Sequence, residues 1–364
     1  MLMLTHWFVM DTTNASQWRR IIDQLECADV FYTPEYCNLY EKNGEGMAQC
    51  FVYQEGDNLV CYPFLLRKIK ELPRYANSQV ADGLYDIVTP YGYGGPITNV
   101  AEPAERLKLL ESFERIFDEY CKEKRIVTEF VRFHPLLRNH DYYLDIAPQF
   151  NRNTVYIDLR LSEEEIQEQF SGPCKNRIRK AVKEGLTVHS TKSGIESFIT
   201  MYYATMDKLG ADSFYYFPKE TFYNTMDLLE GNSDILEVHL NEKVILSGLF
   251  LHYGPYLHFH LIGSDKDYLH LAPTNLLFDY AAKWGKANGF TYLHLGGGYK
   301  ADDSLYRFKK HFNKGDDLDF YIGKKVRCAE EYRLLTTEFD GERYGDYFPI
   351  YRHPRLNDPI SIAQ

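Results

Sequence analysis

The sequence predicts an α/β fold of two similar domains that meet near residue 150. Two observations predict it. At roughly 100–200 residues per domain, a chain of 364 residues is long enough for two. The same order of elements, a hairpin, a strand, a helix and a strand, also occurs twice, in pattern and not in residue identity. The linker is expected near Ala147–Asn153, where PQFNRN separates two patterned stretches.

The first copy begins with a hairpin. Its turn is the sequence Glu55-Gly56-Asp57-Asn58, a hairpin turn signal between two predicted strands. A strand, a helix with apolar residues at helical spacing, and a further strand follow. The expected elements are Cys50–Gln54, Leu59–Arg67, Tyr85–Thr89, Pro103–Lys124 and Val127–Phe133.

The second copy lies in the second half of the chain. Its expected elements are Ile235–Leu240, Val244–Tyr253, Tyr256–Gly263, Pro273–Asn288 and Phe290–Leu295. Before it we expect a strand, Thr154–Leu159, and a helix capped by Ser162 with Glu165 as its capping-box partner. Further helices are expected at Pro173–Glu184, Gly194–Leu209, Lys219–Leu229 and Val326–Leu335.

Composition excludes several classes of protein. Acidic residues exceed basic ones by 52 − 41 = 11, which argues against coating of nucleic acid in bulk and against DNA as a partner. No apolar stretch approaches the roughly 20 residues of a membrane span. The N-terminal stretch lacks the basic region of a signal peptide. Seven scattered cysteines form neither a disulfide framework nor a zinc motif, so we expect a cytoplasmic protein.

One candidate for chemistry is the segment Ala301–Phe312, which follows a predicted strand and Gly296–Gly298. The glycines allow a close approach of backbone to a ligand. Asp302, Asp303 and Ser304 can cap a helix. We expect Leu305, Phe308 and Phe312 to form its buried apolar stripe, and Lys310 and Lys314 to be solvated. Lys309 lies at the edge of the stripe, with its aliphatic chain along Phe308 and its ammonium free. This ammonium and backbone donors near Gly296–Gly298 can stabilise a developing oxyanion. On periodicity alone, an ordinary amphipathic helix explains this segment as well.

Two further segments could bind substrate. The helix CKNRIRKAVK places Lys175, Arg177 and Lys180 where they could contact phosphates, with Ile178 and Val182 facing inward. The loop PYGYGGP offers Tyr91 and Tyr93 as stacking surfaces beside its glycines. A solvated basic face and a structural tight loop are the alternative interpretations.

The histidines do not form a metal motif. His258 and His260 share one face of a predicted strand, but no H-E-x-x-H motif or cysteine partner accompanies them. We therefore expect no metal, and imidazoles that are buried or line a cleft. The chain also lacks a G-x-S-x-G motif or another signature of a nucleophile.

At this point the residues resemble a family. The segments DDSLYRFKKHF, FSGPCKNRIRKAVKEGLTVHS, YATMDKLGA and IGSDKDYLHLAP, with the GGP turn at Gly94–Pro96, are similar to the Fem-type (FemABX) peptidoglycan aminoacyl transferases. This family belongs to the GNAT acyltransferase superfamily. The resemblance runs from about Lys42 to Gly323 and is closer in the second half.

The resemblance implies two GNAT-like domains, each a mixed, mostly antiparallel sheet flanked by helices, with a cleft between them. Residues 1–150 would form the acceptor domain and 151–324 the donor and catalytic domain, with 325–364 packing back on the first. Lys309 falls on the lysine of the family's SLYxFKxxF motif and Lys42 on its nucleotide-phosphate lysine. Asn99 replaces an acidic residue found in some members, and Lys208 lies near a phosphate-contacting arginine.

We therefore expect an acyltransferase that forms an amide without a cofactor. Its donor would be aminoacyl-tRNA, bound through the acceptor end, and its acceptor an amine of a peptidoglycan or other cell-envelope precursor. One alternative is an acyl-coenzyme A N-acyltransferase of an amino sugar in exopolysaccharide. Against it, Asp265–Asn275 contains no glycine and carries Asp267, where a phosphate loop would need bare backbone N–H groups. A non-catalytic nucleotide-sugar binding protein is a second alternative. The sequence leaves the oligomeric state open.

Overall fold

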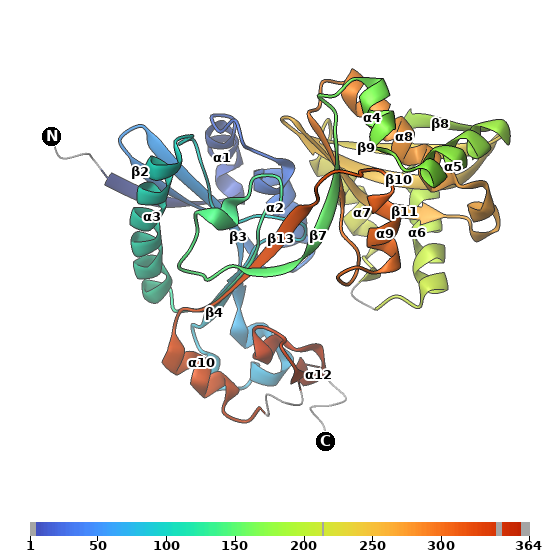
Figure 1. The fold of residues 1–364 in the computed structure, drawn as a ribbon. Coiled ribbons are helices and arrows are strands. Elements are labelled where there is room, and N and C mark those ends of the chain that lie inside the picture. The colour runs from blue at the N-terminus through green and yellow to red at the C-terminus, as the bar shows by residue number, and fades with distance from the viewer. Residues whose placement is uncertain (1–4, 213–214, 340–343, 358–364) are drawn as a thin grey trace. The chain divides into compact units, whose positions relative to one another are not determined.

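The computed structural model describes residues 5–212, 215–339 and 344–357. The first four residues of the N-terminal stretch considered above lie outside this range. The chain divides into two compact units. Unit 1 holds residues 1–151 with 320–364, and unit 2 holds residues 152–319. Figure 1 shows the elements of both.

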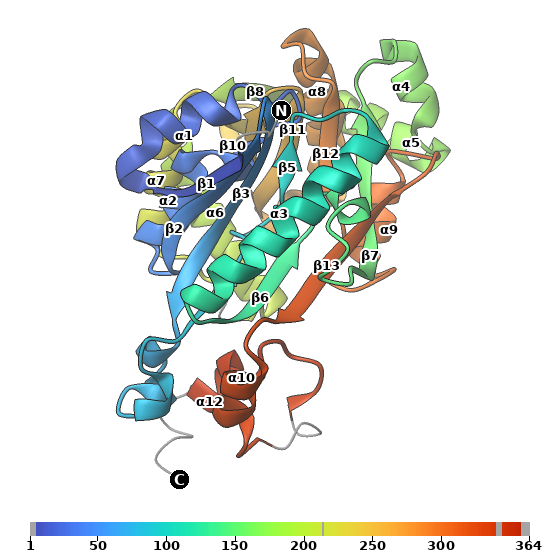
Figure 2. The same cartoon turned by 90° about the vertical axis from the view of Figure 1, so that its left-hand side faces the viewer.

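Unit 1 is built on a mixed sheet whose strands pair antiparallel, except for one parallel pair. The strand order is β1 (Thr5–Asp11), β2 (Met47–Glu55), β3 (Asn58–Lys68), β4 (Tyr85–Val88), β6 (Ile126–Arg132) and β13 (Leu318–Val326), with short β5 (Ile97–Thr98) beside β3. The parallel pair is β4 with β6. Helix α3 (Pro103–Glu123) runs along one face, as Figure 2 shows, and packs Phe113 and Phe117 on the sheet. Helices α1 (Ala15–Ile22) and α2 (Pro34–Lys42) also belong to this unit.

Unit 2 repeats this topology. Its strand order is β8 (Leu186–Thr191), β9 (Ser233–Leu240), β10 (Lys243–Tyr253), β11 (Tyr256–Ser264), β12 (Tyr292–Gly296) and β7 (Gln149–Asp158). Again one neighbouring pair, β11 with β12, is parallel. One face packs against α4 (Glu163–Gln169), α5 (Gly172–Lys183), α8 (Pro273–Ala287) and α9 (Ser304–Lys310). The other carries α6 (Ile195–Leu209) and α7 (Lys219–Leu228).

The expected fold class and the repeated order of elements are confirmed. Both hairpins, the strand after each and the helix after that strand occur within a few residues of the expected bounds. The capping box at Ser162 and Glu165 is present, with the Ser162 N–H donating to the Glu165 carboxylate at 2.8 Å. The linker expected near Ala147–Asn153 is wrong in part, because β7 already begins at Gln149.

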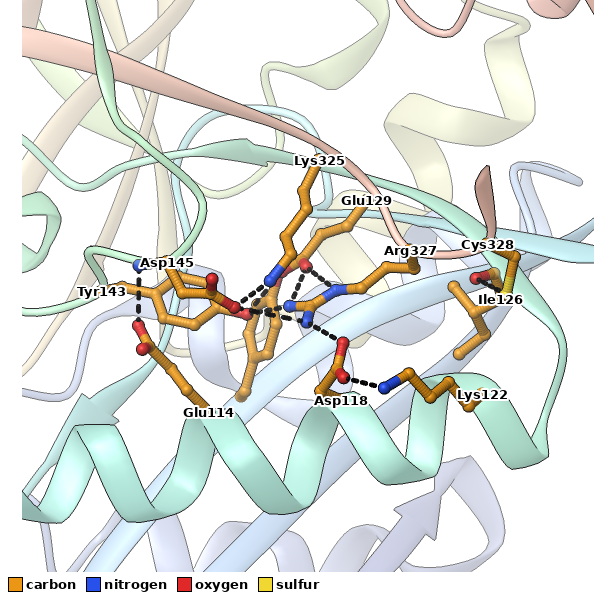
Figure 3. A network of polar contacts seen from close by, with 11 residues as sticks. Glu114, Asp118, Lys122, Ile126, Glu129, Tyr143, Asp145, Lys325, Arg327 and Cys328 are labelled. Atoms are coloured by element: carbon orange, nitrogen blue, oxygen red, sulfur yellow. Dashed lines mark hydrogen bonds and ion pairs between the residues drawn. The ribbon is translucent and has the colours of Figure 1, made fainter. Parts of the chain in front are cut away.

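The C-terminal segment of unit 1 is held by a buried polar network (Figure 3). The helix expected at Val326–Leu335 is present as α10 (Ala329–Thr336), and it begins later than expected because β13 extends to Val326. Just past β13, the Arg327 guanidinium donates to the Glu129 carboxylate through Nε at 2.9 Å and Nη2 at 2.5 Å. Tyr143 donates to the other oxygen of Glu129 at 3.0 Å. A buried ion pair with these extra hydrogen bonds ties Arg327 to strand β6.

Candidate active site

The candidate catalytic lysine lies in the last turn of α9 in unit 2. Asp303 caps this helix and accepts a hydrogen bond from the Tyr306 N–H at 2.8 Å. The same carboxylate accepts from the Lys300 N–H at 2.9 Å, which fixes the loop that leads into the helix. Only 6% of Lys309 is exposed. A cap at one end and burial at the other therefore give Lys309 a defined position.

The Lys309 amine lies where two parallel strands separate. Strands β11 and β12 pair only from Tyr256 to His258 on one strand and Tyr292 to His294 on the other. Beyond these pairs, Lys309 Nζ donates to the Gly297 carbonyl at 2.7 Å and lies 5.5 Å from the centre of the Phe259 ring. The space for this arrangement is small, because a Cβ on Gly297 would approach the Asn153 carbonyl to 2.7 Å.

Burial determines the charge of this amine. Burial lowers the pKa of Lys309 from 10.5 to about 7, with Asp303 opposing this effect and Arg152 adding to it. Near neutral pH the amine is therefore present both as an ammonium and as a free amine. The ammonium can donate a hydrogen bond to an oxyanion in a site that is poor in water, where such a bond is strong.

Arg152 is a member of this site that the sequence did not reveal. Its Nη1 donates to the carbonyls of Gly298 and Tyr299, each at 2.7 Å, and so holds the glycine loop in place. Arg152 lies in the segment Ala147–Asn153, which the sequence predicts to be a linker. Its link to a loop about 146 residues away left no local signal in the sequence.

The expected surroundings of Lys309 need a correction. We expected a free ammonium with its aliphatic chain along Phe308, and backbone donors at Gly296–Gly298. Instead, the Gly297 carbonyl accepts from Lys309. Leu305, expected in the buried stripe, is 46% exposed. The reason is that α9 is only seven residues long, so its last turn and not its whole length meets the core.

Unit 2 also contains a cavity of about 330 Å³ beside α9. Its walls come from the first turns of α5 and α8 and from one face of α9. The lining residues are Pro173, Cys174, Arg177, Asn275, Ser304, Arg307, Phe308 and His311. Phe308 belongs to this wall and is adjacent in sequence to Lys309.

Of the three basic residues expected to contact phosphate, only Arg177 lines this cavity. Lys180 instead donates to the His270 carbonyl at 2.9 Å and so supports the segment before α8. Lys175 is half-buried in the first turns of α5. The inward position given to Val182 is wrong, since it is 58% exposed and Ala181 is buried in its place.

The residues of unit 1 that we expected to bind the acceptor are Lys42, Tyr91 and Tyr93, and their surroundings differ from one another. Lys42 is exposed in the last turn of α2. The Tyr91 carbonyl accepts from the Tyr36 hydroxyl at 2.7 Å, which anchors the PYGYGGP loop. The Tyr93 ring packs against Phe31, with ring centres 5.4 Å apart. Gly92 has a φ of +91°, and a Cβ there would approach the Phe31 ring to 2.5 Å, so this loop requires a glycine.

The remaining three residues that we expected to contact substrate are Asn99, Lys208 and His260. Asn99 closes the first hairpin, accepting from the Leu59 N–H at 2.8 Å and donating to the Asp57 carbonyl at 2.9 Å. Lys208 is exposed in the last turn of α6. His260 is the extra residue of a bulge in β11. Burial, then the nearby His258, lowers the pKa of His260 to about 4, so it is neutral at pH 7.

Comparisons with known proteins identify a domain within unit 2 and a fold for the chain. Residues 172–310, all in unit 2, match the model of the acetyltransferase (GNAT) domain. A crystal structure of FemX superposes with a TM-score of 0.65, covering 90% of this chain and 99% of that chain at 13% identity. The chain carries a GNAT-type acyltransferase domain within a FemX-like fold.

Other comparisons agree with this fold. A conserved protein of unknown function from Bacteroides thetaiotaomicron superposes with a TM-score of 0.52, covering 88% of this chain and 99% of that chain at 10% identity. No curated protein matched the sequence. The match to the acetyltransferase (GNAT) domain confirms the superfamily resemblance for residues 172–310, and acyl transfer is the activity that this domain supports. Among the described residues, no helix is long and apolar enough to cross a membrane.

Proposed function

We propose that this GNAT-type acyltransferase moves an aminoacyl group from aminoacyl-tRNA to an amine of a peptidoglycan or other cell-envelope precursor. The observation that carries the proposal is the buried Lys309 amine, held by Gly297 where β11 and β12 separate. A family resemblance to Fem-type transferases supports the choice of donor. The donor is made in the cytoplasm, in keeping with the location expected from the sequence.

The proposed reaction needs no covalent enzyme intermediate. The amine nitrogen of the acceptor attacks the carbonyl carbon of the aminoacyl ester, and the carbonyl oxygen becomes an oxyanion. The Lys309 ammonium donates a hydrogen bond to this oxygen. The intermediate then expels the ribose oxygen of the tRNA. The attacking nitrogen loses a proton and the leaving oxygen gains one, so the products are an amide and a free ribose hydroxyl.

The loop before α8 argues for this donor over an acyl-coenzyme A. In the described chain the loop is a 3-10 segment, Lys266–Leu271, whose N-terminal carboxylate Asp265 already accepts from the Asp267 N–H at 3.1 Å. A phosphate placed there would meet two carboxylates instead of free N–H groups. Coenzyme A as donor, with an amino sugar as acceptor, remains the second candidate because the matching domain is described as an acetyltransferase.

Catalysis is favoured over a purely binding role by the energetic cost of Lys309. A buried ammonium without a carboxylate partner destabilises the folded state. A binding protein would gain nothing from keeping it. Local features that oppose stability concentrate at functional sites.

A donor screen tests the proposal. The protein is incubated with a panel of amine acceptors and either radiolabelled aminoacyl-tRNA or radiolabelled acetyl-coenzyme A. We expect label in the amide product only with the charged tRNA, and none after treatment of the tRNA with ribonuclease. Transfer from acetyl-coenzyme A alone would overturn the choice of donor. The absence of transfer from both donors, with binding of nucleotide sugars retained, would favour the binding protein.

A further inference from the structure

The glycine loop before α9 presents three successive carbonyls to two cations. The Gly297 carbonyl accepts a hydrogen bond from Lys309 Nζ at 2.7 Å. The next two carbonyls, those of Gly298 and Tyr299, both accept from Arg152 Nη1 at 2.7 Å. The carbonyl that holds the Lys309 amine therefore directly precedes, in the chain, the two peptide groups that Arg152 holds.

A carboxylate holds the same loop from the other side. Asp303 accepts from the Lys300 N–H at 2.9 Å and also caps α9. Burial raises the pKa of its carboxyl group, but the pKa is lowered because that effect is outweighed by hydrogen bonds from the backbone N–H groups of Tyr306, Lys300, Tyr299 and Leu305. The ionised carboxylate therefore binds both the loop and the first turn of the helix.

Arg152 and Asp303 hold the same two peptide groups. Both peptides are trans, so the C=O and the N–H of each point in opposite directions. The Gly298 carbonyl and the Tyr299 N–H belong to the first peptide, and the Tyr299 carbonyl and the Lys300 N–H to the second. The guanidinium therefore binds the oxygen side of both, and the carboxylate binds the nitrogen side. A Cβ on Gly298 would overlap the Asp303 carboxylate, so this arrangement requires a glycine.

The two charges also act on the Lys309 amine, in opposite directions. Burial lowers the pKa of Lys309 to about 7, the negative charge of Asp303 opposes this effect, and the positive charge of Arg152 adds to it. Other ionisable side chains on the elements around the amine include Asp279, Arg307, Lys310, His258, His260 and His294. A change at Arg152 or Asp303 leaves all of these side chains in place.

We propose that Arg152 and Asp303 are positioning residues for Lys309, because they hold the glycine loop from both sides and so fix the amine where β11 and β12 separate. The use of this position for catalysis rests on the oxyanion role proposed above for Lys309. Both residues act through the backbone of the loop, so neither has to touch the substrate. Their loss should therefore slow the chemical step more than it weakens substrate binding.

Three variants separate the charge of these residues from their grip on the loop. Arg152→Met removes both, whereas Arg152→Lys keeps the charge without the planar fork of a guanidinium. Asp303→Asn removes the negative charge and keeps a residue that caps helices well. The matched control is Arg160→Met, because Arg160 is exposed just after β7 and pairs with Asp158 at 2.6 Å. Melting temperatures establish that each variant is folded, and the Lys and Asn variants keep the test decisive where Arg152→Met is not.

The first measurement needs no substrate. The Lys309 amine is titrated by NMR in full-length protein that contains isotope-labelled lysine, with Lys309→Met to assign its signal. The pKa of Lys309 should be higher than in wild type in Arg152→Met, which loses a like charge, and lower in Asp303→Asn, which loses an opposite charge. Arg152→Lys and Arg160→Met should titrate like the wild type. Shifts in the same direction, or no shift in either variant, would overturn the proposal.

The second measurement is the rate of transfer from charged tRNA across a range of pH. Arg152→Met should lower kcat on the order of 100-fold, with a smaller change in KM. Because the reaction uses the ammonium, the rate falls as pH rises through the pKa of Lys309. This fall should move to higher pH in Arg152→Met and to lower pH in Asp303→Asn. Arg152→Lys should keep the wild-type pH dependence and have a lower kcat, and a wild-type kcat in this variant would overturn the role of the grip.

The two measurements fail independently of each other. Opposite shifts in the NMR titration, without transfer from any donor, would support the positioning pair and contradict the proposed function. Transfer at the wild-type kcat in both Arg152→Met and Asp303→Asn would overturn the positioning pair and leave the proposed function intact. A loss of kcat in Arg160→Met equal to that in Arg152→Met would also overturn it, because Arg160 does not contact the loop.

Discussion

Replacement of Lys309 by methionine should make unit 2 more stable and the enzyme slower. Burial lowers the pKa of Lys309 from 10.5 to about 7. One pKa unit is about 1.4 kcal/mol, so below pH 7 the buried charge lowers the free energy of unfolding by roughly 4–5 kcal/mol. Methionine has a similar length and no charge, so Lys309→Met removes this cost.

A lost hydrogen bond offsets part of this gain. Methionine cannot donate to the Gly297 carbonyl, which now accepts from Lys309 at 2.7 Å. A buried acceptor left without a donor costs about 1–3 kcal/mol. The net gain at pH 6 is therefore about 1–4 kcal/mol. For a unit of this size, 1 kcal/mol raises the melting temperature by roughly 2–4 °C.

The pH dependence separates this effect from ordinary repacking. Between pH 7 and 10.5 the unfolded chain carries a proton on Lys309 that the folded chain has lost, so wild-type stability rises with pH there. Lys309→Met lacks this rise. The difference in unfolding free energy between variant and wild type should therefore be largest near pH 6 and shrink by pH 9, measured by urea denaturation.

Lys309→Met should lower turnover although it raises stability. Loss of one donor to an oxyanion typically costs on the order of 100- to 1,000-fold in kcat. Lys314→Met is the control, since Lys314 is exposed and its ammonium donates to the Glu168 carbonyl at 2.9 Å. Lys310 does not serve as a control, although we expected it to be solvated, because it pairs with Asp317 at 2.7 Å. A Lys309→Met variant that is less stable than wild type by the same amount at pH 6 and pH 9 would refute the reasoning.

Three further predictions concern the scaffold. Gly263→Ala should lower the melting temperature, because a Cβ would lie 2.4 Å from the Tyr202 backbone nitrogen, whereas Gly172→Ala meets no atom within 4 Å and should be tolerated. Arg327→Met should cost about 3–5 kcal/mol in urea unfolding by leaving Glu129 buried without its cation, and adding Glu129→Gln should restore part of it; a loss that the second change does not reduce would contradict this. Burial raises the pKa of Glu114 to about 7, opposed by Lys325 and Arg327. Its stabilising effect is therefore full below pH 4.5 and lost as pH rises through about 7. Glu114→Gln should accordingly raise the melting temperature more at pH 8 than at pH 4.5, and an equal change at both pH values would argue against it.

Much of the fold was predictable because its signals are local. The first hairpin has a turn sequence between its two strands. Helix α3 has Pro103 at its start and α8 ends just before Gly289, as the position preferences of these residues predict. Strand β13 was not predictable, because its residues alternate poorly between buried and exposed. It becomes a strand by pairing with β6, whose residues lie about 190 positions earlier.

The candidate site was predictable only in part for the same physical reason. The helical repeat of α5 predicts which side of the helix Arg177 lies on. It does not predict that α9, about 130 residues later in the chain, faces this side. Phase alone could not separate Arg177 from Lys175 and Lys180. The burial of Lys309 was also not predictable from the sequence. The groups that surround its amine, the Phe259 ring and the Gly297 carbonyl, are 50 and 12 residues away in the chain.

Two buried cations show how the same fold produces a structural charge and a titratable one. Burial opposes the charge of both Arg327 and Lys309. At Arg327 the attraction of the Glu129 carboxylate outweighs it, so the pKa of the guanidinium is raised and the charge is permanent. At Lys309, within the described chain, the hydrogen-bond acceptor is the neutral Gly297 carbonyl, and the pKa falls to about 7. A group that only held the fold together would be better served by a carboxylate partner. The amine that lacks one keeps its hydrogen-bonding capacity for a negative charge that arrives during a reaction, which is what stabilisation of an oxyanion requires.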